Sequence, residues 1–236
     1  MWNKIINRFN IQMLAAFLFL TSFLTSNGQQ NEKLPVIKKF SEYKQSVKAD
    51  SLKKMVELRT IMPIIHYDLR YATLNNFVHE QMYKDGDVTF LRLPVARAIA
   101  KVERELNEEG LALKIWDAYR PHHVTVRMWN LIKDDRYVAD PKKGSGHNRG
   151  IAVDLTLINK ASGAELDMGT GFDNFSDTAH QKFPNLPSVV LQNRQLLKTT
   201  MEKYGFTPLE TEWWHFSWNH SDFEVLDIEP KKFKKN

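Results

Sequence analysis

The sequence IAVDLTLI at residues 151–158 is rich in β-branched residues and almost entirely apolar. An apolar run of this length without polar alternation predicts an interior strand that is buried on both faces. Asp154 lies in the middle of this run, where an aspartate is costly unless it is paired or coordinated. The segment therefore predicts the centre of the fold and also a first candidate for a functional residue.

The segments on either side predict a mixture of helices and strands. Helical periodicity, a proline near the start and Gly110 after the end predict a helix at residues 93–109. Further helices are expected at 122–134 and 188–204, and further strands at 111–116 and 212–218. Because helices and strands do not alternate regularly, we expect an α+β fold, a single domain with a central antiparallel-rich sheet flanked by helices.

The N-terminus has the layout of a secretory signal peptide. Lys4 and Arg8 precede an eleven-residue apolar run, MLAAFLFLTSF, and Ser26 and Gly28 offer a cleavage point. The run is shorter than the roughly 20 residues of a spanning helix. Residues 1–28 are therefore expected to be a signal peptide, with a retained membrane anchor as the alternative.

The rest of the chain is predicted to form one exported enzyme domain with two flanking segments. Residues 29–60 are expected to be a leader or a loosely packed helix, 61–228 the catalytic domain, and 229–236 a solvated basic tail. Without residues 1–28 the chain has 31 basic and 28 acidic residues, a net charge of +3 that does not favour a nucleic-acid partner. We expect a periplasmic or secreted protein with no stable membrane insertion after cleavage; the oligomeric state is not predictable.

Two further segments contain residues typical of a zinc enzyme. His147 precedes Asp154 in SGHNRGIAVD (145–154), and Glu212 and His215 lie in EWWHFSW (212–218). Two histidines and one carboxylate are a usual ligand set for catalytic zinc, and Glu212 would remain available as a general base. Residues three apart on a flat strand point to opposite faces, so we expect a bulge at Trp213 and Trp214.

A third segment, WDAYRP (116–121), places Arg120 directly after a predicted strand. Its permanent positive charge is suited to stabilise an oxyanion. Tyr71 is open to two interpretations, as part of a pocket wall or as a substrate contact.

Together, SGHNRGIAVD, WDAYRP, DMGTGFD (167–173), EWWH and YDLRYATLNNF (67–77) make the chain resemble the VanX-type D-alanyl-D-alanine dipeptidases. These belong to a zinc peptidase superfamily that includes DD-carboxypeptidases and the hedgehog domain, so the resemblance implies a hedgehog/DD-peptidase-like fold.

The resemblance also implies the roles of individual residues. It implies one Zn²⁺ per chain, held by His147, Asp154 and His215. Glu212 is then the catalytic base and Arg120 the oxyanion stabiliser. Asp173 would bind the substrate ammonium, and Ser145 would contact the substrate.

The expected reaction is zinc-dependent hydrolysis of D-alanyl-D-alanine or a similar small dipeptide. Two alternatives stay open. One is a DD-carboxypeptidase or endopeptidase that acts on longer cell-wall stem peptides, and the other is a zinc-bearing binding domain without turnover.

Overall fold

The computed structural model describes residues 34–84, 86–219 and 223–235, which belong to one compact unit. The signal peptide predicted at residues 1–28 lies outside the described residues. The helices are α1 (Phe40–Ala49), α2 (Leu93–Glu108), α3 (His122–Leu131), α4 (Gly146–Arg149) and α5 (Ser188–Lys203). The strands are β1 (Val36–Ile37), β2 (Met55–Glu57), β3 (His66–Tyr67), β4 (Phe90–Arg92), β5 (Leu111–Asp117), β6 (Ala152–Asn159), β7 (Phe206–Leu209), β8 (Glu212–Trp218) and β9 (Val225–Leu226).

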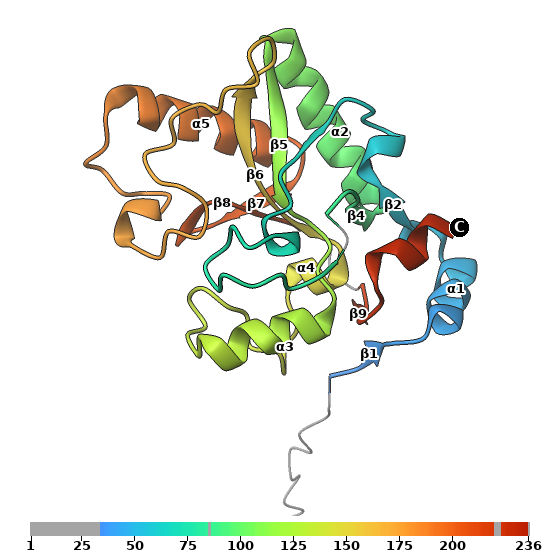
Figure 1. Ribbon diagram of the computed structural model, residues 1–236. Coiled ribbons are helices and arrows are strands. Elements are labelled where there is room, and N and C mark those ends of the chain that lie inside the picture. The colour runs from blue at the N-terminus through green and yellow to red at the C-terminus, as the bar shows by residue number, and fades with distance from the viewer. Residues whose placement is uncertain (1–33, 85, 220–222, 236) are drawn as a thin grey trace, which may run out of the picture. The chain divides into compact units, whose positions relative to one another are not determined.

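A five-stranded sheet with the order β3-β5-β6-β8-β7 forms the centre of the molecule (Figure 1). The pair β3–β5 is parallel and the other three pairs are antiparallel. Strand β6 lies in the middle, and residues 152–158 are all buried, as the apolar run predicted. The predicted α+β class with an antiparallel-rich sheet is confirmed.

Helices α2 and α5 pack against the sheet and against each other. Alternation along β6 directs Val153, Leu155 and Leu157 to one face, where they join the main core with Ile99 of α2. The intervening residues of β6, including Asp154, face the other way. Helices α2 and α5 therefore cover one face of the sheet, and the candidate site lies on the opposite face.

Two irregularities in the sheet lie beside Asp154. The register of β5 on β6 shifts between Ile115 and Asp117, so that Trp116 is an extra residue and Asp117 pairs with Asp154. On the other side, Leu209 of β7 pairs with Glu212, but its neighbour Pro208 pairs with Phe216. Residues 213–215 are thus extra on β8, which confirms the bulge expected there. Bulges of this kind re-aim side chains next to active sites.

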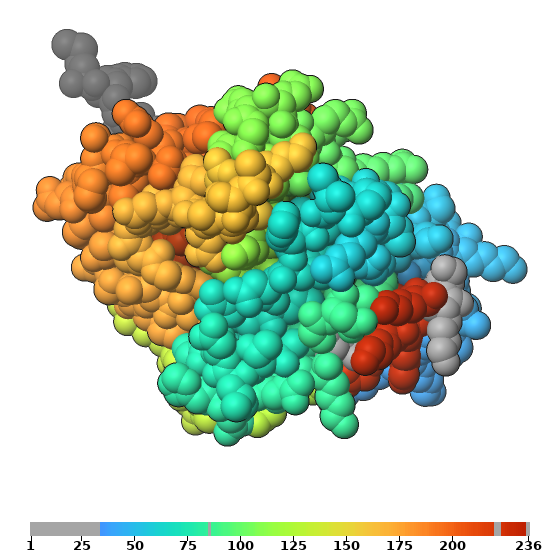
Figure 2. All heavy atoms as spheres, turned by 45° about the horizontal axis from the view of Figure 1, so that its top comes forward, coloured from blue at the N-terminus to red at the C-terminus, as the bar shows by residue number. Residues whose placement is uncertain are grey.

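The N-terminal helix and the C-terminal segment form a second core, and this differs from the sequence expectation. Tyr43 of α1 is fully buried, and Phe233 of the final 3₁₀ helix (Pro230–Lys235) is 3% exposed. Their rings meet edge to face with centroids 5.0 Å apart. Figure 2 shows the red C-terminal segment lying beside the blue N-terminal one. The expectations of a loosely packed first helix and a solvated tail are therefore wrong for these residues.

Two smaller expectations also need correction. Buried residues of the main core begin before Ile61, with Val56 and Leu58. After the predicted strand at 212–218, the structure has a further strand that was not predicted, β9, which pairs with β1. Short strands of two residues carry too little periodicity to be recognised in a sequence. Within the described part of the chain, no helix is both long and apolar enough to span a membrane.

Candidate active site

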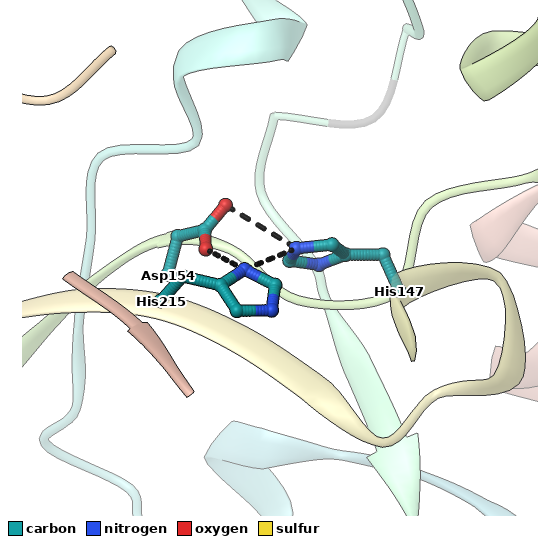
Figure 3. A group of neighbouring side chains, drawn as sticks. All are labelled: His147, Asp154 and His215. Atoms are coloured by element: carbon teal, nitrogen blue, oxygen red, sulfur yellow. Dashed lines mark hydrogen bonds and ion pairs between the residues drawn. The ribbon is translucent and has the colours of Figure 1, made fainter. Parts of the chain in front are cut away.

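The side chains of His147, Asp154 and His215 converge on one point from three separate elements (Figure 3). His147 Nε2 lies 3.3 Å from His215 Nδ1, and Asp154 Oδ1 lies 2.9 Å from His215 Nδ1. Asp154 Oδ2 is 3.4 Å from His147 Nε2. The expected convergence of these three residues is therefore observed.

The hydrogen bonds of the two histidines indicate which nitrogen of each ring can bind a metal. His147 Nδ1 lies 2.8 Å from the Ala118 carbonyl, which can only accept, so Nδ1 carries the proton and Nε2 does not. On His215, Nε2 lies 3.2 Å from Ser217 Oγ. A hydroxyl can accept a proton from Nε2, and in that tautomer the lone pair of Nδ1 is available to a metal. Partners of this kind orient histidine ligands in metal sites.

Helix α4 holds His147 in place through an N-terminal capping box. Ser145 Oγ accepts from the Asn148 amide at 3.1 Å, and Asn148 Oδ1 accepts from the Ser145 amide at 3.0 Å. The Asn148 side chain also donates to the Arg120 carbonyl at 2.8 Å and to Thr125 Oγ1 at 2.9 Å. Asn148 thus connects α4 to the Arg120 loop and to α3.

Electrostatics favour an ionised carboxylate at Asp154 and a neutral imidazole at His215. Burial acts to raise the pKa of Asp154, but His147 and His215 outweigh it and hold this pKa well below its usual range. Burial lowers the pKa of His215, although Asp154 opposes the shift. Deprotonated groups are the form in which metal ligands bind.

Arg120 is held by Asp117, a residue that the sequence reasoning missed. Arg120 Nε and Nη2 donate to Asp117 Oδ2 at 2.8 and 2.7 Å. Asp117 is fully buried and also accepts from Tyr83 Oη at 2.8 Å. Arg120 Nη2 lies 3.8 Å from Asp154 Oδ2. Burial acts to lower the pKa of Arg120, but Asp117 and the other neighbouring groups raise it above the ordinary value, so the guanidinium remains charged.

Glu212 lies at the edge of the cluster but outside it. Its Oε2 is 4.0 Å from His215 Nδ1, and the residue is 6% exposed. Burial, followed by the negative charges of Asp154 and Asp173, raises the pKa of Glu212 well above its ordinary value. A carboxylate with a raised pKa beside a metal site is a typical candidate for a general base.

Asp173 lines the same cleft as the cluster. Its Oδ1 accepts from Tyr71 Oη at 2.8 Å, while Oδ2 is enclosed and has no hydrogen-bond partner among the described residues. Burial raises the pKa of Asp173 to about 7, and the nearby Asp154 adds to the shift. The sequence allowed two roles for Tyr71, part of a pocket wall or a substrate contact. In the structure Tyr71 lines the cleft and donates a hydrogen bond to the Asp173 carboxylate.

The cleft has a volume of about 270 Å³. All seven candidate residues from the sequence line it, namely Arg120, Ser145, His147, Asp154, Asp173, Glu212 and His215. Trp214 is 1% exposed and also lines the cleft.

The donor set fits a tetrahedral metal with one open position. Ligand bonds of about 2.0–2.2 Å place neighbouring donor atoms roughly 3.3–3.6 Å apart, close to the separations in the cluster. Two imidazoles, one carboxylate and an adjacent buried glutamate in an α+β fold define the class of zinc metallohydrolases.

Comparison with known proteins gives the family. The family model described as D-ala-D-ala dipeptidase (Peptidase_M15) matches residues 51–230, and the chain belongs to this peptidase family. The D-alanyl-D-alanine dipeptidase of Escherichia coli (strain K12) is 37% identical over 163 residues, 69% of this chain and 83% of that protein. The D-alanyl-D-alanine dipeptidase of Enterococcus faecium is 30% identical over 173 residues, 64% of this chain and 85% of that protein.

The similarity to solved structures is weaker. The structure of the LdcB LD-carboxypeptidase aligns with 65% of this chain and 67% of its own, at 20% identity and a TM-score of 0.37. This likeness is too low to inform the fold or the site. Family membership and the donor set together make the protein a metallopeptidase with zinc as its cofactor.

Proposed function

We propose that the protein hydrolyses D-alanyl-D-alanine, or a similar small D-amino-acid dipeptide, to free amino acids in cell-wall precursor or peptide turnover. The observation that carries this proposal is the position of Asp173, which lines the same cleft as the His147, Asp154 and His215 cluster and whose Oδ2 has no hydrogen-bond partner among the described residues. An enclosed carboxylate oxygen without a hydrogen-bond partner is costly. The free ammonium of a dipeptide would supply a charge-assisted hydrogen bond at this atom.

His147, Asp154 and His215 would hold the zinc ion. When bound, zinc supplies Lewis-acid polarisation of a carbonyl and lowers the pKa of water. Glu212 takes a proton from the attacking water, whose oxygen bonds to the scissile carbon, and gives that proton to the leaving nitrogen as the C–N bond breaks. Arg120, fixed by Asp117, supplies positive charge beside the oxygen that becomes negative.

The experiment that tests the function uses a preparation with a measured zinc content and three substrates. We expect hydrolysis of D-alanyl-D-alanine and much slower hydrolysis of the L,L isomer and of the N-acetylated D,D form. Equal turnover of the acetylated form would indicate a carboxypeptidase. No turnover of any substrate by zinc-loaded protein would indicate a binding domain.

We further propose that the protein is exported and acts in the periplasm or outside the cell. Support comes from the charged and apolar pattern of residues 1–28. The proposed boundary at residue 28 rests on the same pattern, whereas Tyr43 of the segment 29–60 and Phe233 of the segment 229–236 belong to the second core. Mass spectrometry of protein from the native host, compared between cell fractions, tests export and cleavage together.

A further inference from the structure

Arg194 is a buried arginine of α5 that the proposed mechanism does not use. The residue is 5% exposed and does not line the cleft. Its Nε donates to the Met168 carbonyl at 2.8 Å. Its Nη2 donates to the Thr178 carbonyl at 3.0 Å, and its Nη1 donates to the His180 carbonyl at 3.2 Å. One guanidinium therefore bonds two separate stretches of backbone.

The two stretches are the ends of a segment that carries Asp173. We call residues 168–180, which lie between β6 and α5, the Asp173 loop (Figure 1). Asp173 is five residues from Met168 and five from Thr178, so Arg194 bonds the loop on both sides of it. The backbone φ of Asp173 is 58°, in the left-handed region that residues other than glycine adopt at a cost. A conformation of this kind persists only where the surrounding structure holds it, and bonds at both ends limit the movement of the loop.

The Asp173 loop is also bonded to β8, the strand that carries Glu212. Trp213 Nε1 donates to Thr170 Oγ1 at 2.8 Å. Gln181, directly after the loop, donates from Nε2 to the carbonyls of Glu212 and Trp213, both at 3.3 Å. The guanidinium carbon of Arg194 lies 5.7 Å from the centroid of the Trp213 ring. Arg194 therefore lies where the loop, α5 and β8 meet.

The chemistry of arginine suits this position. Burial lowers the pKa of Arg194 to about 10 and Asp167 opposes the shift, so the guanidinium is charged at neutral pH. Its donors form a rigid plane that reaches carbonyls in several directions. A lysine has one side-chain nitrogen and a glutamine one amide nitrogen, so neither reproduces this set of bonds.

We propose that Arg194 is a positioning residue for substrate binding, which holds the Asp173 loop so that the Asp173 carboxylate meets the free ammonium of the dipeptide. This inference rests on the proposed function and deepens it. Arg194 lies outside the cleft lining and acts through the loop, not by touching the substrate. Without its bonds the carboxylate is no longer fixed relative to the metal ligands, and a displacement of about 1 Å is enough to weaken such a contact strongly.

The test measures kcat/KM of the zinc-loaded protein for D-Ala-D-Ala and for its N-acetylated form, which has no ammonium. The readout is the ratio of the first value to the second. We expect Arg194→Gln to lower this ratio about tenfold or more. In protein that also carries Asp173→Ala, the same substitution should change the ratio less than about twofold, because both residues act on one contact. A purely structural role of Arg194 would slow both reactions alike and leave the ratio unchanged.

Arg92→Gln is the matched control. Arg92 is fully buried and, like Arg194, donates to three backbone carbonyls, those of Lys53, Arg149 and Glu224. None of these carbonyls belongs to the Asp173 loop, so the ratio should stay at the wild-type value in this variant.

The proposal is overturned if the ratio in folded Arg194→Gln stays within about twofold of wild type, or if it falls by the same factor with and without Asp173→Ala. If Arg194→Gln does not fold, Arg194→Lys replaces it, and it must still lower the ratio.

Hydrogen exchange separates this proposal from the proposed function, because it needs no activity. Amides of residues 168–180 should exchange about threefold faster or more in the Arg194 variant and at the wild-type rate in Arg92→Gln. Unchanged exchange in the Arg194 variant overturns the proposal even when the dipeptide is cleaved. The proposed function fails on its own when the zinc-loaded wild-type chain cleaves no dipeptide.

Discussion

Glu212 is a buried carboxylate that lies beside the metal ligands without belonging to them, 4.0 Å from His215 Nδ1. We expect Glu212→Gln to lower kcat by about two orders of magnitude or more, because a positioned general base contributes on this scale. Zinc content and the unfolding temperature should stay close to wild type. Metal analysis and circular dichroism of the variant check both. Loss of zinc together with activity would show that Glu212 is a ligand.

Asp173 allows a prediction about pH and stability in zinc-free protein. Its pKa is raised to about 7, so the folded state holds this proton at pH values where the unfolded state has released it. The folded state is therefore increasingly disfavoured as pH rises from the ordinary aspartate pKa to about 7, and the penalty is then constant.

Replacing Asp173 with Asn removes this penalty. We expect the variant to be more stable than wild type by about 1–2 kcal/mol near pH 8, since water screens a partly exposed carboxylate, and to show no advantage near pH 4. Urea unfolding at the two pH values measures the difference. If the variant were more stable by the same amount at both pH values, ionisation of Asp173 would not be what destabilises the folded state.

At the scale of single residues, the sequence identified the reactive side chains, but it did not identify the residues that hold them in place by hydrogen bonds. The cluster residues were recognisable because an aspartate in an apolar strand needs a partner. Asp117 was missed, although WDAYRP was singled out for Arg120. The hydrogen bond to Asp117 from Tyr83 joins residues 34 positions apart, and no local pattern shows such a contact.

Helix α4 is only four residues long, and its stability depends on the cap that Ser145 provides. We expect Ser145→Ala to destabilise the protein by about 0.5–2 kcal/mol and to weaken zinc binding, because His147 lies in the capped turn. Ser145→Thr keeps the hydroxyl and should retain most of both. Thermal unfolding and zinc titration are the measurements. A higher KM with unchanged stability would instead support a substrate contact.

At the scale of elements, the long segments were predictable and the short ones were not. The helical spacing of apolar residues, with Pro94 at the start and Gly110 after the end, predicted a helix at 93–109. Helix α2 ends one residue earlier, at Glu108. The bulge in β8 was predictable because Glu212 and His215 could not otherwise share a site. Strands β1 and β9 have two residues each and exist only because they pair with each other across the molecule. A pairing over this distance leaves no local signal.

The second core joins the two ends of the described chain, and its centre is Phe233. The ring contacts Tyr43, Phe90 and Tyr119 at centroid distances of 5.0, 5.4 and 5.3 Å. We expect Phe233→Ala to lower the free energy of unfolding by about 3–5 kcal/mol, as for other buried aromatics. Urea denaturation measures it. A change below about 1 kcal/mol would show that the tail is not part of the core.

Zinc should stabilise the whole molecule, because the residues proposed to hold it come from α4, β6 and β8. At a free concentration of about 1,000 times Kd, a ligand that binds only the folded state adds about 4 kcal/mol. We therefore expect a chelator to lower the melting temperature of the wild-type chain and to leave His215→Ala unchanged. An equal decrease in both proteins would show that the stabilising metal binds elsewhere.

The central claim is that His147, Asp154 and His215 hold a zinc ion in this cleft. Anomalous diffraction from a crystal of the zinc-loaded protein, recorded on both sides of the zinc absorption edge, tests it most directly. The account predicts one strong peak per chain, about 2.0–2.2 Å from His147 Nε2, His215 Nδ1 and an Asp154 oxygen. A zinc peak bound to other residues, with none among these three side chains, would contradict it.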